Sequence, residues 1–430
     1  MQMTSSSNNA IPHLVLHSVT GGVDDSFVGL KFDGNQIHIF HPECYSISGE
    51  TPKARNEILA LIRTISIAKT ASLERSKAYN TQNDGGDFAL YSYLWMINDF
   101  LANGFYVNRE KTYKVNQNGR INWKRTMQTE PIVSENNVVF PNITVEKKSE
   151  MDNILVEVHK LCVKKSIDYI GWLFNLNSSF IVVPRLTDSI KKAYLNAVQQ
   201  ELDHTFLDSK RLLLNHMKNI LNGLDERSNN KEFVYGVDSY YYIFERMIDS
   251  IFGNVDRMID FYPSSKWQLV RDNFAEHESS KLRPDTIILQ KDDCDHYTAF
   301  ILDSKFYRFG FTGDEADLPE TTSIQKQITY DEYIQKNTDY PIVNVYNAFL
   351  MPYDKTRDVF KSNENIQYIG FAKSTWKDNE NSHELIHSFL IDLKHVIMNW
   401  NNYNHADDVA ILVEMIIKHQ EKANSLMVSI

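Results

Sequence analysis

The chain has 430 residues, of which 42% are hydrophobic and 12% aromatic. This composition suits two or three packed domains and excludes a disordered chain. Its 45 basic and 56 acidic residues give a net charge of −11, which excludes a chain that is basic overall, although a local basic patch remains compatible with it.

The three cysteines, Cys44, Cys162 and Cys294, lie far apart and form no CxxC pair. They therefore argue against a thiolate zinc site or a disulfide framework and indicate a reduced intracellular chain. No secretory signal or apolar membrane span is visible, so we expect a cytoplasmic protein that does not bind a membrane. The motifs GxxxxGK[ST], GxGxxG and GxSxG are missing from the sequence, so we expect this chain to bind no nucleotide.

The first half of the chain alternates between strand-like and helical patterns. Residues 12–48 alternate in polarity and predict short strands. Residues 104–145 also look β-like, and Asn118-Gly119 between extended arms predicts a two-residue hairpin. Apolar residues at helical spacing predict helices at residues 52–80, 87–102, 151–180 and 186–224.

The second half follows a polar linker at residues 222–233. Strand-like runs occur near residues 284–290, 297–305, 343–353 and 366–372. Helical patterns occur at residues 238–252, 323–336, 380–400 and 405–424. The whole pattern predicts an α/β protein of mixed α+β type.

One segment, residues 282–310, brings together the residue types that phosphodiester hydrolysis requires. Asp285 begins one apolar run, and a second run ends in Asp303-Ser304-Lys305. Residues i and i+2 share a face of a strand, so Asp303 and Lys305 should point the same way. A hairpin between the two runs would also place Asp285 beside Asp303. Two carboxylates and an ammonium group at one sheet end can hold Mg²⁺, activate water and stabilise charge on phosphorus.

The [DE]xK pattern alone is a weak signal, because it also occurs at Asp208-Ser209-Lys210 in a helical stretch. Only Asp303 follows a Pro-Asp, a strand and a turn. The simpler alternative to a catalytic site is an exposed ion pair at a hairpin end. An upstream helix adds Glu245, which lies at the edge of an apolar face and could lean over the sheet end as a further ligand, although an exposed helix charge is an equally good interpretation.

These residues resemble the PD-(D/E)xK nuclease superfamily, and more closely the LlaJI-type restriction endonuclease family, which is akin to McrC. The resemblance rests on several motifs in order over residues 230–400: the helix with Glu245, Leu282-Arg283-Pro284-Asp285, Ile301 to Arg308, Ile324 to Tyr330 and Tyr346 to Tyr353. The segment Gly119 to Thr126 is similar to the N-terminal half of McrC-type chains.

The resemblance implies roles for single residues. Asp285, Asp303 and Glu245 would be metal ligands and catalytic carboxylates, and Lys305 would be the catalytic lysine. Gln327 and Tyr330 resemble the glutamine–tyrosine motif near the scissile phosphate, with Gln325 as a competitor for the glutamine position. The cofactor would be Mg²⁺, with Mn²⁺ as a substitute.

The same resemblance implies a subunit of a type II or type IV-like restriction system that cuts double-stranded DNA. Its partners would be a McrB-like AAA+ GTPase and a cognate DNA methyltransferase. We expect residues 1–150 to form a β-rich and helical domain that docks the partner and touches DNA, 151–225 a helical connector, and 226–430 the PD-(D/E)xK nuclease core. The alternative from another class is a non-cleaving subunit that stimulates the GTPase.

Two further features compete for a functional interpretation. His383-Glu384-Leu385-Ile386-His387 matches the HExxH signature of zinc proteases, which requires a helix, but the apolar pattern around it favours a packing helix. Residues 104–125 carry a net charge of +5 and could contact phosphates or a partner, or form a solvated strand pair. The basic residues proposed for this contact are Arg109, Lys114, Arg120, Lys124 and Arg125.

Overall fold

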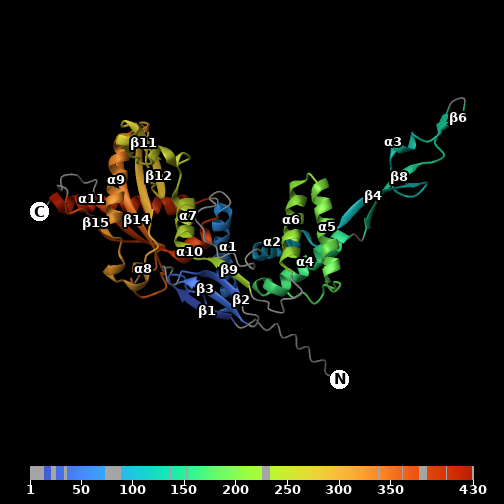
Figure 1. Cartoon of the computed structure of the whole chain (residues 1–430), viewed down its shortest axis with the longest axis horizontal. Helices are drawn as coiled ribbons and strands as arrows, with labels where there is room; N and C mark the ends of the chain where they lie inside the picture. The colour runs from blue at the N-terminus through green and yellow to red at the C-terminus, as the bar shows by residue number, and fades with distance from the viewer. Residues whose placement is uncertain are drawn as a thin grey trace, which may run out of the picture. The chain divides into compact units, whose positions relative to one another are not determined.

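The computed structural model shows a mixed α+β protein and describes residues 14–20, 26–32, 36–72, 89–134, 137–151, 154–224, 233–337, 339–360, 362–376, 385–402 and 404–428 (Figure 1). The chain divides into two compact units. One is formed by His13–Gln82 together with Val234–Ile430, and the other lies within Asn83–Phe233. The first unit is therefore discontinuous in sequence, and we call it the nuclease unit because it contains Asp285 and Asp303, for which the family resemblance implies a nuclease site. The second is called the inserted unit.

A five-stranded sheet forms the centre of the nuclease unit. Its strands, in spatial order, are β12 (Thr286–Lys291), β13 (Tyr297–Ser304), β14 (Ile342–Tyr353), β16 (Leu385–Asp392) and β15 (Ile366–Lys373). The strands β13, β14 and β16 run parallel, whereas β12 and β15 are antiparallel to their neighbours. Every residue of β16 is buried, as expected for a strand that is covered on both faces.

Helices cover this sheet. They are α7 (Tyr240–Phe252), α8 (Phe309–Thr312), α9 (Thr321–Asn337), α10 (Leu393–Asn399) and α11 (Ala406–Val428). A further helix, α1 (Thr51–Ser72), packs on α7 and α10. Helix α9 packs Tyr330 and Ile334 against Ile287, Ile301 and Val345 of three strands. Helix α7 contacts β12 and β13, and Figure 1 shows α7 and α9 with the sheet between them.

A smaller sheet joins the two sequence segments that form the nuclease unit. Its order is β1 (Leu14–Val19), β3 (Ile37–Pro42), β2 (Val28–Phe32) and β9 (Phe233–Val237). Gly29 has a φ of +153° and faces the Tyr235 backbone so closely that a Cβ atom would lie 2.1 Å from its carbonyl oxygen. Only glycine permits this approach of β2 to β9.

The segment after β3 is attached to the carboxyl ends of the central strands. The Cys44 thiol donates to the Pro352 carbonyl, and the Ser46 hydroxyl donates to Asp354. The Lys394 ammonium lies 2.8 Å from Glu57 of α1. Residues 43–57 therefore belong to the same body as the central sheet.

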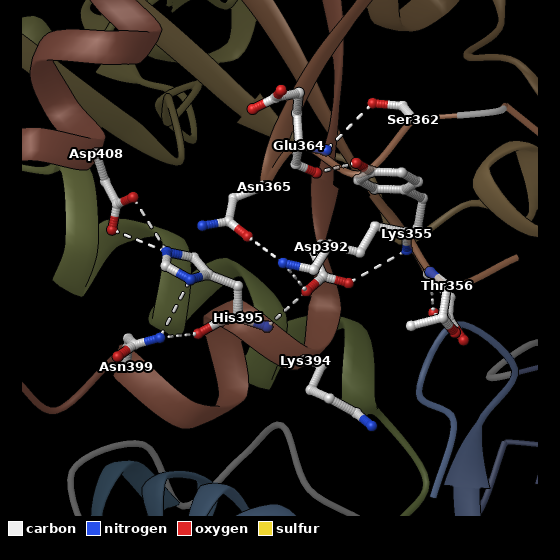
Figure 2. A network of polar contacts seen from close by, with 12 residues as sticks. Lys355, Thr356, Ser362, Glu364, Asn365, Asp392, Lys394, His395, Asn399 and Asp408 are labelled. Carbon is white, nitrogen blue, oxygen red and sulfur yellow. Dashed lines mark hydrogen bonds and ion pairs between the residues drawn. The ribbon is translucent and has the colours of Figure 1, made fainter. Parts of the chain in front are cut away.

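A polar network fixes the ends of β14 and β16 (Figure 2). Asp392 accepts hydrogen bonds from the backbone N–H groups of His395 and Lys355, and so caps α10. His395 Nε2 lies 3.0 Å from both carboxylate oxygens of Asp408, while its Nδ1 faces the Asn399 amide. Both ring nitrogens are thus engaged, which makes this histidine a structural residue and leaves no free base.

Gly310 of α8 provides a test of this packing. A Cβ atom at this position would lie 1.9 Å from the Pro352 carbonyl oxygen and 2.8 Å from Tyr353 Cβ. We expect Gly310→Ala to destabilise the protein by about 1–3 kcal/mol, because overpacking forces the backbone apart. Thermal unfolding measures the effect, with Gly49→Ala as the control, since nothing lies within 4 Å of its Cβ position. Equal melting temperatures for both variants would contradict the close packing of α8 on β14.

The inserted unit contains a helical part and a β-ribbon. Its helices are α2 (Ala89–Asn103), α4 (Ile154–Ile170), α5 (Asp188–His204) and α6 (Asp208–Gly223). The ribbon has the strand order β4 (Asn108–Val115), β8 (Thr144–Met151) and β5 (Arg120–Ile121), followed outward by α3 (Trp123–Thr126) and the pair β6 (Ile132–Ser134) and β7 (Asn137–Val139). Within this unit the ribbon runs away from the helices (Figure 1).

Short elements complete the described chain. They are the 3₁₀ turns η1 (Gly171–Phe174), η2 (Met258–Phe261), η3 (Val270–Asp272) and η4 (Glu315–Asp317), and the strand pair β10 (Lys266–Gln268) and β11 (Glu276–Glu278). Among the described residues, no helix is both long enough and apolar enough to cross a membrane.

Two of the sequence predictions are wrong. The stretch 385–392, which we predicted as helix, is the buried strand β16. Its apolar residues at 385, 386, 389 and 390 fit helical spacing, but they also fit a strand that is covered on both faces. Asn118-Gly119 does not close a two-residue hairpin, because β4 and β5 both pair with β8 and lie on its opposite edges. Most of the expected linker at 222–233 lies outside the described residues.

Candidate active site

The antiparallel pairing of β12 with β13 brings the two aspartates together. Thr286 pairs with Leu302, so Asp285, one residue earlier, lies opposite Asp303. The backbone N–H of Ser304 donates to Asp285 Oδ2 at 2.9 Å, which fixes this carboxyl group at the end of β13. The hairpin predicted from the sequence is thereby confirmed.

Lys305 completes the group just beyond the end of β13. Its Nζ lies 2.6 Å from Asp303 Oδ2, as expected when residues i and i+2 share a face. Its backbone N–H donates to the Leu350 carbonyl of β14 at 2.9 Å, so the lysine still follows the sheet. Asp303 itself is only 5% exposed.

The electrostatics of the group show a surplus of negative charge. Burial raises the pKa of Asp285 to about 8, and the charges of Asp303 and Glu245 add to this effect. Burial alone would lower the pKa of Lys305, but the attraction of Asp303 and Asp285 outweighs it and raises that pKa. The lysine is thus held as a cation, and one carboxyl group of the pair tends to retain a proton.

Glu245 on α7 belongs to the same electrostatic environment. Burial and the Asp303 charge raise its pKa to about 7, while the Lys305 charge opposes the shift. The residues predicted to form the apolar face of this helix are all buried: Tyr240, Ile243, Phe244, Met247, Ile248 and Ile251. Glu245 is half-buried at the edge of that face.

Helix α9 brings Tyr330 close to the same charges. Burial raises the pKa of its hydroxyl group, and Asp303 and Asp285 raise it further. The hydroxyl donates to the Arg283 carbonyl at 3.0 Å, two residues before Asp285. Gln327, one turn earlier, is fully buried, and neither of its amide atoms has a partner among the described residues. Gln325 is exposed, so Gln327 fits the glutamine position better.

A cleft of about 490 Å³ opens beside this group. Its lining includes Glu245 and Lys305 and, from outside the predicted set, Tyr241, Tyr307 and Arg308. The sequence gives none of these three a role, although Tyr307 and Arg308 lie two and three residues after Lys305, in the segment that carries the resemblance. Thr20, which follows β1, also lines the cleft, and no sequence pattern pointed to it.

The donor set fits a magnesium ion of the kind that keeps most of its waters. Across the described part of the chain, no three His, Cys, Asp or Glu side chains converge as a ready-made metal cage. Mg²⁺, however, is commonly held by one or two carboxylates plus water and substrate phosphate. Asp285 and Asp303 supply hard oxygen donors. Burial is the main cause of the raised pKa of Asp285, and the repulsion by Asp303 and Glu245 that adds to it is one that a divalent cation would relieve.

Comparison with known proteins identifies the family. The family model of the LlaJI restriction endonuclease matches residues 27–383. The chain belongs to the LlaJI restriction endonuclease family. This membership makes it a nuclease of a restriction system.

The other comparisons found distant likenesses. No curated protein sequence matches the LlaJI-family chain. Among solved structures, a half-complex of Thermococcus gammatolerans McrB AAA+ hexamers with bound McrC gives a TM-score of 0.37 at 12% identity, covering 85% of this chain and 77% of that one. The McrBC complex of the same organism gives a TM-score of 0.20 at 13% identity, covering 52% and 64%.

The HExxH segment of this LlaJI-family chain has a structural role where it is described. His383 and Glu384 lie outside the described residues. His387 lies on strand β16 and not on a helix, and its Nε2 is 2.8 Å from Gln420 Oε1. Burial lowers the pKa of this histidine. The zinc-protease interpretation is therefore wrong, since the signature needs both histidines on one helical face.

The predicted basic residues lie on the ribbon of the inserted unit. Lys114, Arg120, Lys124 and Arg125 are exposed. The Arg125 guanidinium stacks over the Tyr113 ring at 3.8 Å. Arg109 lies on β4. In this LlaJI-family chain the basic stretch and the carboxylate group thus belong to different units.

Proposed function

We propose that the chain is a Mg²⁺-dependent endonuclease subunit that hydrolyses phosphodiester bonds of double-stranded DNA. The observation that carries this proposal is the arrangement of Asp285, Asp303 and Lys305 at one end of β13, beside a cleft. The simpler alternative, an exposed ion pair at the end of a hairpin, does not explain why Asp303 is buried.

The residues of the chain divide the chemistry between them. Asp285 and Asp303 would hold Mg²⁺, which supplies an activated water and neutralises developing charge when it is bound. Lys305, held as a cation beside Asp303, can donate to a phosphate oxygen and stabilise the transition state. Glu245, with its pKa raised to about 7, can accept or release a proton at neutral pH. The unpartnered amide of Gln327 can orient a water molecule, and Mn²⁺ would substitute for Mg²⁺.

The proposal includes partners. A McrB-like AAA+ GTPase would deliver the chain to DNA, and a cognate methyltransferase would complete a type II or type IV-like system in the cytoplasm. The family resemblance supports these partners, and so does the ribbon of the inserted unit. Its outer part exposes a group of large apolar side chains, which is unusual on a protein surface and typical of a contact site. They are Trp123, Met127, Ile132, Val133, Val138 and Val139.

A substitution on the ribbon tests the docking role. Val133 of β6 pairs with Val138 of β7, and its side chain is 71% exposed. We expect Val133→Asp to weaken binding to the AAA+ GTPase of the same system about tenfold or more, because a charge would enter an apolar contact. Isothermal titration of the two full-length proteins measures the affinity. Val182→Asp, at an 88% exposed valine of the same unit, is the control. Equal losses in both variants would argue against a specific contact.

Plasmid cleavage by the purified chain tests the central proposal. We expect cleavage that depends on Mg²⁺ and increases when the AAA+ partner and GTP are added. Stimulation of the GTPase without any cleavage, under all of these conditions, would favour the non-cleaving alternative instead.

A further inference from the structure

The cleft beside the carboxylate group contains one cation that the proposed chemistry does not use. Among the described side chains that line it, Lys305 and Arg308 are the cations. Lys305 is engaged by Asp303. Arg308 is 44% exposed at its side chain, and it lies three residues further along the chain. Whatever phosphate enters the cleft therefore meets Arg308 as the second positive group.

The backbone of Arg308 is held firmly. The residue precedes α8, and its carbonyl accepts hydrogen bonds from the N–H groups of Phe311 and Thr312. Gly310 packs directly against Pro352, as described above. The guanidinium group therefore starts from a fixed position at the cleft wall.

Glu43 fixes the plane of the guanidinium group. Arg308 Nε donates to Glu43 Oε2 at 2.9 Å, and Nη2 donates to Oε1 at 3.0 Å. Glu43 is only 14% exposed, and its own backbone N–H is bonded to the Val19 carbonyl at 3.0 Å. A guanidinium group has five N–H donors, so this bidentate pair leaves both donors of Nη1 and one of Nη2. No other acceptor for them occurs among the described residues.

A purely structural ion pair between Arg308 and Glu43 is the simpler explanation, but it does not explain why the pair lies in the wall of the cleft. A pair with one exposed partner contributes weakly to stability. It would also not need to lie on the wall of the cleft next to the catalytic lysine. The acidic residue Asp317 on the same wall accepts the Thr312 hydroxyl at 2.5 Å and makes no hydrogen bond to Arg308 among the described contacts, although its charge, like that of Glu43, attracts the guanidinium group.

We propose that Arg308 binds a backbone phosphate of the DNA next to the one that is cut, and that Glu43 positions its guanidinium group for this contact. The inference rests on the proposed nuclease function and names a substrate contact for the same site. Arg308 would donate its free N–H groups to the phosphate oxygens, which is the geometry in which arginine binds phosphate best.

The test measures how DNA binding depends on salt. Full-length protein carrying Asp303→Asn, which we expect to suppress cutting, is titrated with a short double-stranded DNA at several salt concentrations in the absence of Mg²⁺. Adding Arg308→Gln should weaken binding about five- to tenfold near 0.1 M salt and reduce the slope of log K against log salt by about one. Adding Glu43→Gln should leave that slope unchanged, because the cation remains. Arg257→Gln, at an exposed arginine outside the cleft lining, is the matched control and should change neither quantity.

Three results would overturn the inference. The first is a slope that does not change in Arg308→Gln. The second is Glu43→Gln lowering the slope as much as Arg308→Gln does, which would indicate a purely structural pair. The third is no DNA binding by the parent protein even at low salt. If the wild-type protein still cuts plasmid DNA, none of these results contradicts the proposed nuclease function. Failure of the Arg308 inference can therefore be distinguished from failure of the proposed function.

Discussion

Replacing Asp303 with asparagine should reduce DNA cleavage by at least about 10²–10³-fold, on the order expected when one electrostatic component of an active site is removed. The Asp303→Asn variant would keep the shape of the side chain, but it would lose the charge that pairs with Lys305 and that is proposed to hold Mg²⁺. Initial rates of plasmid cleavage at saturating Mg²⁺ measure the effect.

The chain contains a matched control for this experiment. Asp208-Ser209-Lys210 repeats the tripeptide Asp303-Ser304-Lys305, but it begins helix α6, where Asp208 is exposed and Lys210 pairs with Glu201. Asp208→Asn should cleave like the wild type. Binding to the AAA+ partner should be unchanged in both variants. Full cleavage by Asp303→Asn would remove the carboxylate group from the mechanism.

Replacing Asp285 with asparagine should stabilise the metal-free protein while it abolishes cleavage. The folded-state pKa of Asp285 is raised to about 8, so the folded protein binds a proton that the unfolded chain releases. Stability of the wild type should therefore fall as pH rises from about 4 to about 8. Asparagine stays neutral and avoids this loss. We expect a gain on the order of 2–4 kcal/mol at about pH 8, which vanishes near about pH 4.

Thermal unfolding with and without Mg²⁺ checks this expectation. At about pH 8 without metal, Asp285→Asn should melt about 3–7 °C above the wild type. Added Mg²⁺ should raise the melting temperature of the wild type, because it relieves the repulsion between the carboxylates, and should leave the variant almost unchanged. Asp208→Asn should follow the wild type throughout. A wild type that Mg²⁺ does not stabilise would contradict the proposed metal site.

Local spacing in the sequence was enough to predict the centre of the candidate site. The pairing of Asp285 with Asp303 followed from two apolar runs joined by a polar turn, and the common face of Asp303 and Lys305 followed from strand periodicity. The buried face of α7 followed from helical periodicity. These features depend on contacts between residues that are close in sequence.

Features that depend on distant contacts could not be predicted. The pairing of Glu43 with Arg308 joins residues on either side of the inserted unit, and no local pattern encodes it. Strand β16 resembled a helix because its apolar residues Leu385, Ile386, Phe389 and Leu390 recur at helical spacing. Only its burial between β14 and β15 shows that the segment is a strand. The Asn118-Gly119 pair predicted a hairpin between β4 and β5, but β8 lies between these two strands, so they do not pair with each other. The division of roles among residues 1–150, 151–225 and 226–430 stays a prediction.

The discontinuity of the nuclease unit has a consequence for how the protein is made. Strand β2 cannot pair with β9, and Glu43 cannot pair with Arg308, until the ribosome has synthesised the whole inserted unit. The inserted unit is complete in the nascent chain long before Asp303 and Lys305 exist. Long-range pairing of this kind folds slowly. The candidate site thus becomes complete only after the part that is proposed to dock the partner has been synthesised.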